Sequence, residues 1–223
     1  MQRIVQGVIR FQKEVFPGKQ QLFKSLAESQ NPKALFITCA DSRVVPDLIT
    51  QSAPGDLFIC RNAGNIIPPY GEMNGGVSAT IEYAVMALGI RNIIVCGHSD
   101  CGAMRAVLHP EKLHDMPTIA SWLKHAESAR RVAKEKNPHL TGDDLLNATI
   151  EENVISQVHH LRTHPSVAAG VARGTLNLYG WVYGISTGCV TAYDVESGDF
   201  VPLSEGVVPA ATPRLRSRVK EVA

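Results

Sequence analysis

The hydrophobic positions of the chain predict short buried strands separated by helices. Three apolar runs, PKALFITCAD (32–41), LFICRN (57–62) and IIVCGH (93–98), are bounded by polar or turn residues, which is typical of strands buried on both faces. The segment GVSATIEYAVMALG (76–89) between the second and third runs has the length and ending of a helix. Because a strand, a helix and a strand in succession form a parallel unit, the pattern predicts a parallel sheet.

Helical periodicity marks the chain before and after these strands. Apolar side chains recur at helical spacing through residues 1–30, and a break at Pro17-Gly18 predicts two amphipathic helices that form an N-terminal arm. Beyond the third strand, caps and the same spacing predict two longer helices. They cover residues 121–136 and 143–164.

The last apolar segments predict a fourth strand and a hairpin partner. Residues 176–186 and 189–198 alternate apolar with small or polar side chains around the turn-forming pair Thr187-Gly188. We therefore expect an α/β fold with a mainly parallel four-stranded sheet, an added edge strand, flanking helices and the helical arm.

Length and composition favour one globular domain. The chain has 223 residues, of which 44% are hydrophobic and 19% charged, so we expect residues 1–223 to form a single domain with a full core. The formal net charge of +1 argues against partners such as nucleic acid or an anionic membrane. The locally basic end, residues 214–223, is expected to be a mobile tail.

Targeting features and cysteine content favour the cytoplasm. No apolar run approaches the roughly 20 residues of a membrane span, and the first residues lack the apolar core and cleavage site of a secretory signal. We therefore expect a cytoplasmic protein. The cysteines number 5, and this odd count argues against a disulfide framework and for reduced thiols, some of which could bind metal.

Three candidate metal ligands follow predicted strands. Cys39 ends the first strand in the segment CADSR, and His98 with Cys101 follows the third in GHSDCG. Because an open parallel sheet binds ligands beyond the carboxyl ends of its strands, the three side chains converge if those two strands are neighbours. Two thiolates and one imidazole suit zinc and leave a fourth, catalytic position open. Taken singly, each residue is better explained as part of a buried core.

Asp41 and Arg43 follow the first candidate ligand closely. The guanidinium would keep the carboxylate ionised and hold it in one orientation, so Asp41 could accept a proton or orient a metal-bound water. An Asp that caps the next turn, with Arg43 as its surface partner, stays open as the alternative. The other cysteines, Cys60, Cys96 and Cys189, fall inside apolar strands and are expected to pack in the core.

Longer stretches resemble a known family. The segments CADSRVVPDLITQSAPGDLFICRNAGNIIPPYG, GGVSATIEYAV and NIIVCGHSDCGAM, followed by THPSV and YGWVYGIS, resemble the β-class carbonic anhydrases, especially their bacterial and cyanobacterial branch. The resemblance implies reversible hydration of CO2 to bicarbonate and a proton through attack by zinc-bound hydroxide. It also implies one zinc ion per chain on Cys39, His98 and Cys101, with Asp41 and Arg43 as the catalytic dyad.

The resemblance further implies a substrate pocket and an assembly. Gln30, Phe58, Tyr83 and Gly102 correspond to pocket residues, several of which usually come from the partner subunit. A homodimer or homotetramer is therefore expected, with the arm packed across the interface. One subtype of the family has a tryptophan three residues before the first Cys ligand, associated with an inhibitory bicarbonate site. Phe36 stands there in this chain, which favours the subtype without that regulation.

The ligand set leads to two hypotheses about pH. Two thiolates neutralise the charge of zinc, so its water should ionise at higher pH than in a three-histidine site, and activity should rise through the alkaline range. At lower pH Asp41 could leave Arg43 and fill the open zinc position. No histidine stands out as a proton shuttle. Exposed or helix-surface positions are expected for His109, His114, His125, His139, His159, His160 and His164.

Three other interpretations stay open at this point. Related zinc enzymes act on carbonyl sulfide or carbon disulfide, and the motifs do not separate these substrates from CO2. A zinc-stabilised scaffold, with Asp41 as a fourth ligand, is an alternative from another class. A nucleotide-binding turn in the glycine-rich segments is the weakest, because neither G-x-G-x-x-G after a strand nor a Walker lysine is present.

Overall fold

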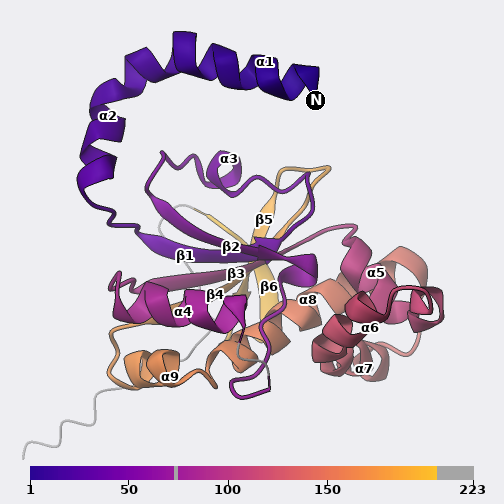
Figure 1. Cartoon of the computed structure of the whole chain (residues 1–223). Helices are drawn as coiled ribbons and strands as arrows, with labels where there is room; N and C mark the ends of the chain where they lie inside the picture. Colours follow the sequence, from indigo (N-terminus) through magenta and orange to yellow (C-terminus); the bar gives the residue numbers. More distant parts are fainter. Residues whose placement is uncertain (73–74, 205–223) are drawn as a thin grey trace, which may run out of the picture.

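A six-stranded sheet forms the centre of the fold, in the order β2-β1-β3-β4-β5-β6 (Figure 1). A computed structural model of the chain describes residues 1–72 and 75–204, and the expected tail at 214–223 lies outside them. The strands are Ala34–Cys39 (β1), Leu57–Asn62 (β2), Asn92–His98 (β3), Asn177–Tyr183 (β4), Val190–Asp194 (β5) and Asp199–Pro202 (β6). Strands β2, β1, β3 and β4 pair in parallel, and β5 and β6 add to β4 in antiparallel order.

The predicted α/β fold with a mainly parallel sheet is confirmed, with one antiparallel strand more than expected. The additional strand is β6, which pairs with β5 through Asp194 and Asp199. It has only 4 residues and ends at Pro202, so it offers too little alternation to be recognised in the sequence.

Helices flank the sheet and fill most of its connections. The α-helices are Gln2–Arg10 (α1), Phe16–Glu28 (α2), Pro46–Thr50 (α3), Gly76–Met86 (α4), Gly102–Leu108 (α5), Pro117–Leu123 (α6), Glu127–Lys136 (α7), Gly142–Leu161 (α8) and Pro165–Ala172 (α9). Shorter helical turns are Phe11–Val15 (η1), Ala63–Asn65 (η2), Pro110–Leu113 (η3) and Lys124–Ala126 (η4). None of the helices in the described part of the chain combines the length and hydropathy of a membrane span.

The main core lies on the sheet face that α4, α8 and α9 cover (Figure 1). There Leu35 of β1 packs in one cluster with Val154 and Val158 of α8. The opposite face carries a second cluster that includes Phe36 and Ile94. All six residues of β1 and all of β3 after Asn92 are buried, which confirms the prediction of strands buried on both faces for these two runs. For β2 the prediction is wrong: it is an edge strand, and Cys60 is its one buried residue.

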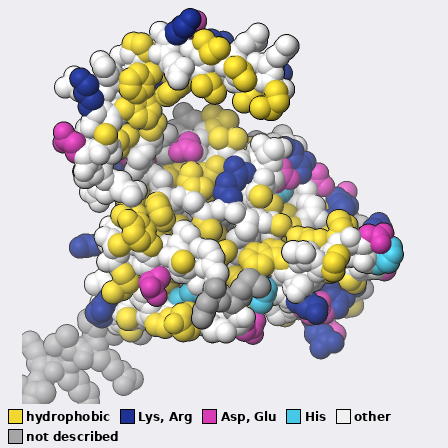
Figure 2. Space-filling model, in the orientation of Figure 1, with side chains coloured by type: hydrophobic (Ala, Val, Ile, Leu, Met, Phe, Trp, Pro, Cys, Tyr) yellow, Lys and Arg dark blue, Asp and Glu magenta, His cyan; other side chains and the backbone are white. Residues whose placement is uncertain are grey.

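The N-terminal arm projects away from this core. Helix α1, the π-helical turn η1 and helix α2 follow one another without a gap, and none of their residues is buried (Figure 1). The predicted break at Pro17 is wrong, because Pro17 lies in the first turn of α2, where a missing N–H costs no hydrogen bond. Apolar side chains such as Ile4, Val8 and Phe11 stay exposed along the arm (Figure 2).

Two expectations about single residues are also wrong. Cys189 does not pack in the core: it is exposed in the turn before β5, next to Gly188, whose φ of +71° lies in the left-handed region. His164 is not a surface residue, because only 2% of it is exposed and its Nε2–H donates to the carbonyl of Pro68 at 3.2 Å. Cys60 and Cys96 are buried, as expected.

The sheet brings the candidate site together at one edge. Strands β1 and β3 are direct parallel neighbours, with Thr38 opposite Cys96, so their carboxyl ends open side by side. The turn η2, which follows β2, contacts both strands and helix α5 at this edge. This is the location where an open parallel sheet binds its ligands.

Candidate metal centre

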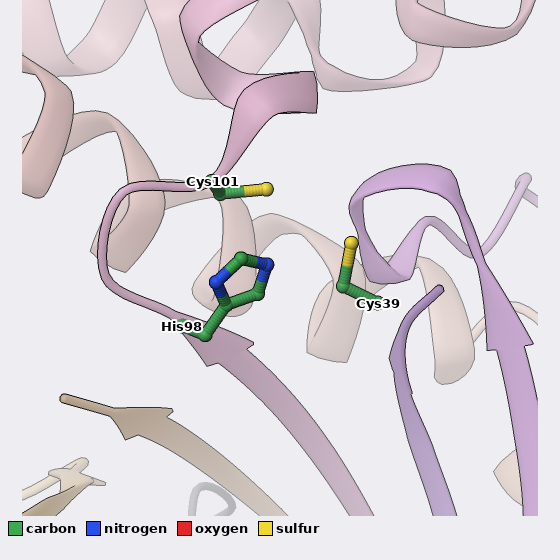
Figure 3. A group of neighbouring side chains, drawn as sticks. All are labelled: Cys39, His98 and Cys101. Carbon is green, nitrogen blue, oxygen red and sulfur yellow. The ribbon is translucent and has the colours of Figure 1, made fainter. Parts of the chain in front are cut away.

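Cys39, His98 and Cys101 point toward one another at the carboxyl edge of the sheet (Figure 3). Cys39 is the last residue of β1, His98 is the last residue of β3, and Cys101 immediately precedes α5. Their Sγ and ring nitrogen atoms all lie within 4.8 Å of one another, and all three residues are buried. The condition stated for convergence, that the two strands are neighbours, is therefore met.

His98 has the tautomer and the orientation of a metal ligand. Its Nδ1–H donates to the carbonyl of Ser99 at 2.8 Å, because a carbonyl can only accept. In the neutral ring this bond leaves Nε2 without a proton, and Nε2 is buried with no hydrogen-bond partner among the described residues. A hydrogen bond from one ring nitrogen to a backbone carbonyl fixes the orientation of the ring and leaves the other nitrogen, here Nε2, free to bind a metal ion. A buried nitrogen without a partner is costly otherwise, so the site fits a cation.

The two thiols are close enough for Cys39 to ionise while Cys101 keeps the proton. Contact with the Cys101 thiol is the largest influence on Cys39 and lowers its pKa against the effect of burial, while the same contact and burial raise the pKa of Cys101. Cys39 also accepts the backbone N–H of Gly64 at 3.4 Å. Burial alone would lower the pKa of His98, but the neighbouring Cys39 sulfur raises it. A divalent cation between the sulfurs would replace the shared proton.

The donor set suits zinc with one position left for a small ligand. Two thiolate sulfurs and one imidazole nitrogen are typical zinc ligands, and three protein ligands are typical of catalytic rather than structural sites. Within residues 1–72 and 75–204, Cys39, His98 and Cys101 form the only group of this kind with three or more His, Cys, Asp or Glu side chains. No fourth His, Cys, Asp or Glu of the described residues completes the group.

Asp41 and Arg43 form a tight pair beside this group. The Arg43 guanidinium donates from Nε to Oδ1 of Asp41 at 3.0 Å and from Nη2 to Oδ2 at 2.8 Å, a bidentate arrangement. These bonds, more than any other influence, hold the pKa of Asp41 well below its usual range. Oδ2 of Asp41 lies 3.9 Å from Nε2 of His98, so the ionised carboxylate faces the candidate metal ligands.

Asp100 extends the pair into a chain of charges that the motif analysis missed. Nη1 of Arg43 donates to Oδ2 of Asp100 at 2.9 Å, and Nη2 of Arg105 donates to Oδ1 of Asp100 at 2.8 Å. Asp100 takes a φ of 54°, a left-handed conformation that Asp adopts more readily than most residues. The feature of the sequence that could have identified Asp100 is its position between His98 and Cys101 in the segment GHSDCG.

Arg61 is a second residue that the sequence alone did not single out. From β2 it donates through Nε to the carbonyl of Cys39 at 3.0 Å and through Nη2 to the carbonyl of Asp41 at 2.6 Å. These bonds fix the backbone that carries both a candidate ligand and the carboxylate. Parallel pairing of Thr38 with Arg61 puts the side chain within reach, which only the strand register reveals.

The residues expected to line the substrate pocket lie at three separate places in the fold. Phe58 of β2 and Tyr83 of α4 are in contact, with ring centroids 6.0 Å apart, and 49% of Tyr83 is exposed. Gly102 begins α5 directly after Cys101. Gln30 lies exposed between α2 and β1 and makes no side-chain hydrogen bond with any other described residue. Phe36, at the position of the subtype tryptophan, is fully buried against Trp181.

Fold and site together define an α/β protein with a buried Cys2His group that could hold a metal ion at the carboxyl edge of a parallel sheet. The family model of carbonic anhydrases matches residues 34–190 of this chain. The chain is 53% identical to a carbonic anhydrase of Pseudomonas aeruginosa over 205 residues, which cover 92% of this chain and 93% of that relative. The chain belongs to the carbonic anhydrases, in their β class, the enzymes that interconvert carbon dioxide and bicarbonate.

Solved structures support the same assignment. The β-carbonic anhydrase CcaA superposes with a TM-score of 0.90 at 47% identity, covering 93% of both chains. Tetrameric β-carbonic anhydrases of the ascomycete Sordaria macrospora superpose with a TM-score of 0.75 at 27% identity, covering 86% of this chain and 95% of theirs. The scaffold and nucleotide-binding alternatives are therefore set aside.

Proposed function

We propose that Cys39, His98 and Cys101 hold one zinc ion per chain and that CO2 is hydrated beside it. The observation that carries the proposal is the bare, buried Nε2 of His98 between two thiols. Zinc bound there supplies a water molecule acidified enough to act as a nucleophile. Hydration of CO2 would add the oxygen of that water to the carbon and release a proton to the surrounding buffer, so the part left to the protein's own residues is to orient the water.

In this proposal Asp41 orients the reacting water. Its pKa is lowered by Arg43, so it stays an ionised acceptor throughout the neutral and alkaline range. An acceptor of this kind takes the hydrogen bond of the water and directs an oxygen lone pair toward CO2. Arg43 holds the carboxylate through two parallel hydrogen bonds and does not itself face the ligands. Asp41 and Arg43 therefore act as the catalytic dyad.

Gln30, Phe58, Tyr83 and Gly102 are proposed to line the pocket for CO2. The aromatic pair Phe58 and Tyr83 supplies apolar surface suited to an uncharged linear molecule. Tyr83 is 49% exposed in the single chain, so this surface is available to a second subunit. Gln30 has a free amide that could donate to the developing bicarbonate.

The proposed working form is a cytoplasmic homodimer or homotetramer. The arm carries exposed apolar side chains along its length, and no residue of α1 or α2 is buried by its own chain (Figure 2). Exposed apolar surface of this extent is typical of protein contacts. The tetrameric Sordaria macrospora enzymes are a precedent for the larger assembly.

Metal analysis together with a CO2-hydration assay tests the proposal. The wild-type protein is expected to hold one zinc ion per chain, and Cys39→Ala is expected to lose both the metal and the activity. Cys189→Ala is the matched control, because Cys189 is exposed and outside the ligand group. Comparing turnover of CO2 with that of carbonyl sulfide and carbon disulfide decides the substrate. Full CO2 hydration by Cys39→Ala, or preference for a sulfur analogue, would refute the proposal.

A further inference from the structure

Helix α8 carries buried polar side chains whose hydrogen bonds go to the segment 62–68. Asn153 and Gln157 are 1% and 0% exposed and lie one helical turn apart. Asn153 Nδ2 donates to the carbonyl of Gly64 at 3.0 Å, and Gln157 Oε1 accepts the N–H of Ile67 at 2.7 Å. Gln157 Nε2 also donates to Oδ1 of Asn153 at 2.9 Å, which orients that amide. Such satisfied polar groups inside a core specify one geometry.

A second helix holds the same segment from another side. Nε1–H of Trp122, in α6, donates to the carbonyl of Ala63 at 2.9 Å. The carbonyl of Ala63 and the N–H of Gly64 belong to one planar peptide group. Fixing the carbonyl therefore fixes the direction of the N–H, and a donor on the carbonyl makes the N–H a stronger donor in turn.

This N–H is the one that reaches Cys39. The distance from the nitrogen of Gly64 to Sγ of Cys39 is 3.4 Å. Gly64 takes a φ of +80°, and a Cβ at this position would lie 3.0 Å from Met104 and 3.1 Å from Ala103. The position therefore requires glycine twice over, for its backbone conformation and for its close approach to α5.

We propose that Trp122 and Asn153 are positioning residues for the N–H of Gly64 that points at the Cys39 thiolate: Trp122 holds the peptide that carries this N–H, and Asn153 holds the next peptide through the carbonyl of Gly64. The inference rests on the proposed function, since Cys39 is its proposed zinc ligand. An N–H that donates to a metal thiolate draws charge from sulfur, so the sulfur gives less charge to the metal. Each thiolate weakens the acidifying effect of the metal on its water. An N–H bond that draws charge from sulfur therefore matters more in a site with two thiolates than in one with three histidines.

Two variants on separate helices test the inference. Trp122→Phe removes the indole N–H and keeps an aromatic ring, and Asn153→Leu removes the amide and keeps the approximate volume. Thr149→Val is the matched control: Thr149 is 0% exposed, lies one turn before Asn153 in α8, and among the described residues its hydroxyl bonds to the carbonyl of Leu145 in its own helix and to nothing else. The control removes a buried hydrogen bond without touching segment 62–68.

The readout is the sulfur-to-metal charge-transfer band of the cobalt(II)-loaded protein. Without the N–H bond the sulfur lone pairs rise in energy, so the band of Trp122→Phe and Asn153→Leu is expected to shift to longer wavelength. The band of Thr149→Val is expected to stay at the wild-type position. With equimolar zinc, each of the two variants should also lose roughly tenfold in kcat/KM, the lower end of effects seen for partners of metal ligands.

A measurement on the wild-type chain keeps the inference testable if both variants fail to fold. With an NMR-active cadmium isotope in the site, a scalar coupling between the metal and the amide proton of Gly64 is expected through the N–H to sulfur bond. A wild-type protein that shows the charge-transfer band but no such coupling overturns the inference, as do folded variants with an unshifted band. A wild-type protein with no sulfur charge-transfer band at all refutes the proposed zinc site instead.

Discussion

Replacing Arg43 by Lys tests how the carboxylate of Asp41 is held. The guanidinium makes two bonds to the Asp41 carboxylate, at 3.0 and 2.8 Å, and two to Asp100, at 2.9 Å to its carboxylate and 3.1 Å to its carbonyl. Lysine keeps the positive charge but offers a single ammonium group, so it cannot form the bidentate fork. The substitution therefore removes the bonds that orient the Asp41 carboxylate and keeps the positive charge at position 43.

The expected effects on stability and on catalysis differ in size. The Arg43 side chain is 44% exposed, so loss of its ion pairs should change the free energy of unfolding very little, because solvent screens exposed pairs. Catalysis depends on the position of the Asp41 oxygens, and a displacement on the order of 1 Å can cost about 100-fold. We expect kcat/KM to fall roughly 10- to 100-fold, which corresponds to about 1.4 to 2.7 kcal/mol in the transition state.

Stopped-flow CO2 hydration, normalised to zinc content, measures this effect. Arg105→Lys is the matched control: its side chain is 47% exposed and pairs with Asp100 and Asp143, with no ion pair to Asp41. The control should keep the activity of the wild type to within about threefold, since exposed pairs contribute little. Wild-type kcat/KM in Arg43→Lys, or an equal loss in Arg105→Lys, would refute the role given to the fork.

Three further outcomes follow from the structure. Activity should rise through the alkaline range, because two thiolates weaken the acidification of the reacting water while Asp41 stays ionised; a rate profile that is flat from mildly acidic to alkaline pH contradicts this. Burial lowers the pKa of His164 below the unfolded value, so the unfolded chain binds more protons and stability falls as the pH drops below about 6.5. In urea titrations His164→Gln should lose less stability than the wild type between neutral and acidic pH, and an equal loss would exclude His164 as a cause. Gly97→Ala should cost about 1–3 kcal/mol in the same titrations, since its Cβ would lie 2.9 Å from Cγ2 of Val154, and adding Val154→Ala should restore part of the loss; no loss would contradict the packing.

The sequence revealed those parts of the fold and site that depend on local pattern. The apolar runs that became β1 and β3 are bounded by polar residues, so their ends could be located, and both proposed strand-end ligands fall there. The parallel arrangement follows from the helix between strands and from the handedness rules for such connections. Cys39 and His98 could therefore be expected to meet on the condition that their strands are neighbours, and it is the pairing of β1 with β3 in the structure that meets this condition.

The missing parts depend on contacts between distant segments. Gly64, Trp122 and Asn153 are far apart in the chain, and nothing in the local pattern of α6 or α8 tells a buried polar residue from a solvated one. The same reason explains His164, which is buried and bonds to the carbonyl of Pro68, a residue distant in the chain. Cys189 was predicted to lie in the last strand, but β5 begins one residue later, at Val190, so the thiol lies in the turn before it.

Zinc-edge X-ray absorption on the purified protein at alkaline pH tests the central claim most directly. The account predicts two sulfur ligands at about 2.3 Å and two nitrogen or oxygen ligands at about 2.0 Å, the latter being His98 and one exchangeable small ligand. Cys39→Ala and Cys101→Ala should each abolish this signature. A shell of four sulfurs, or one without sulfur, would contradict the account.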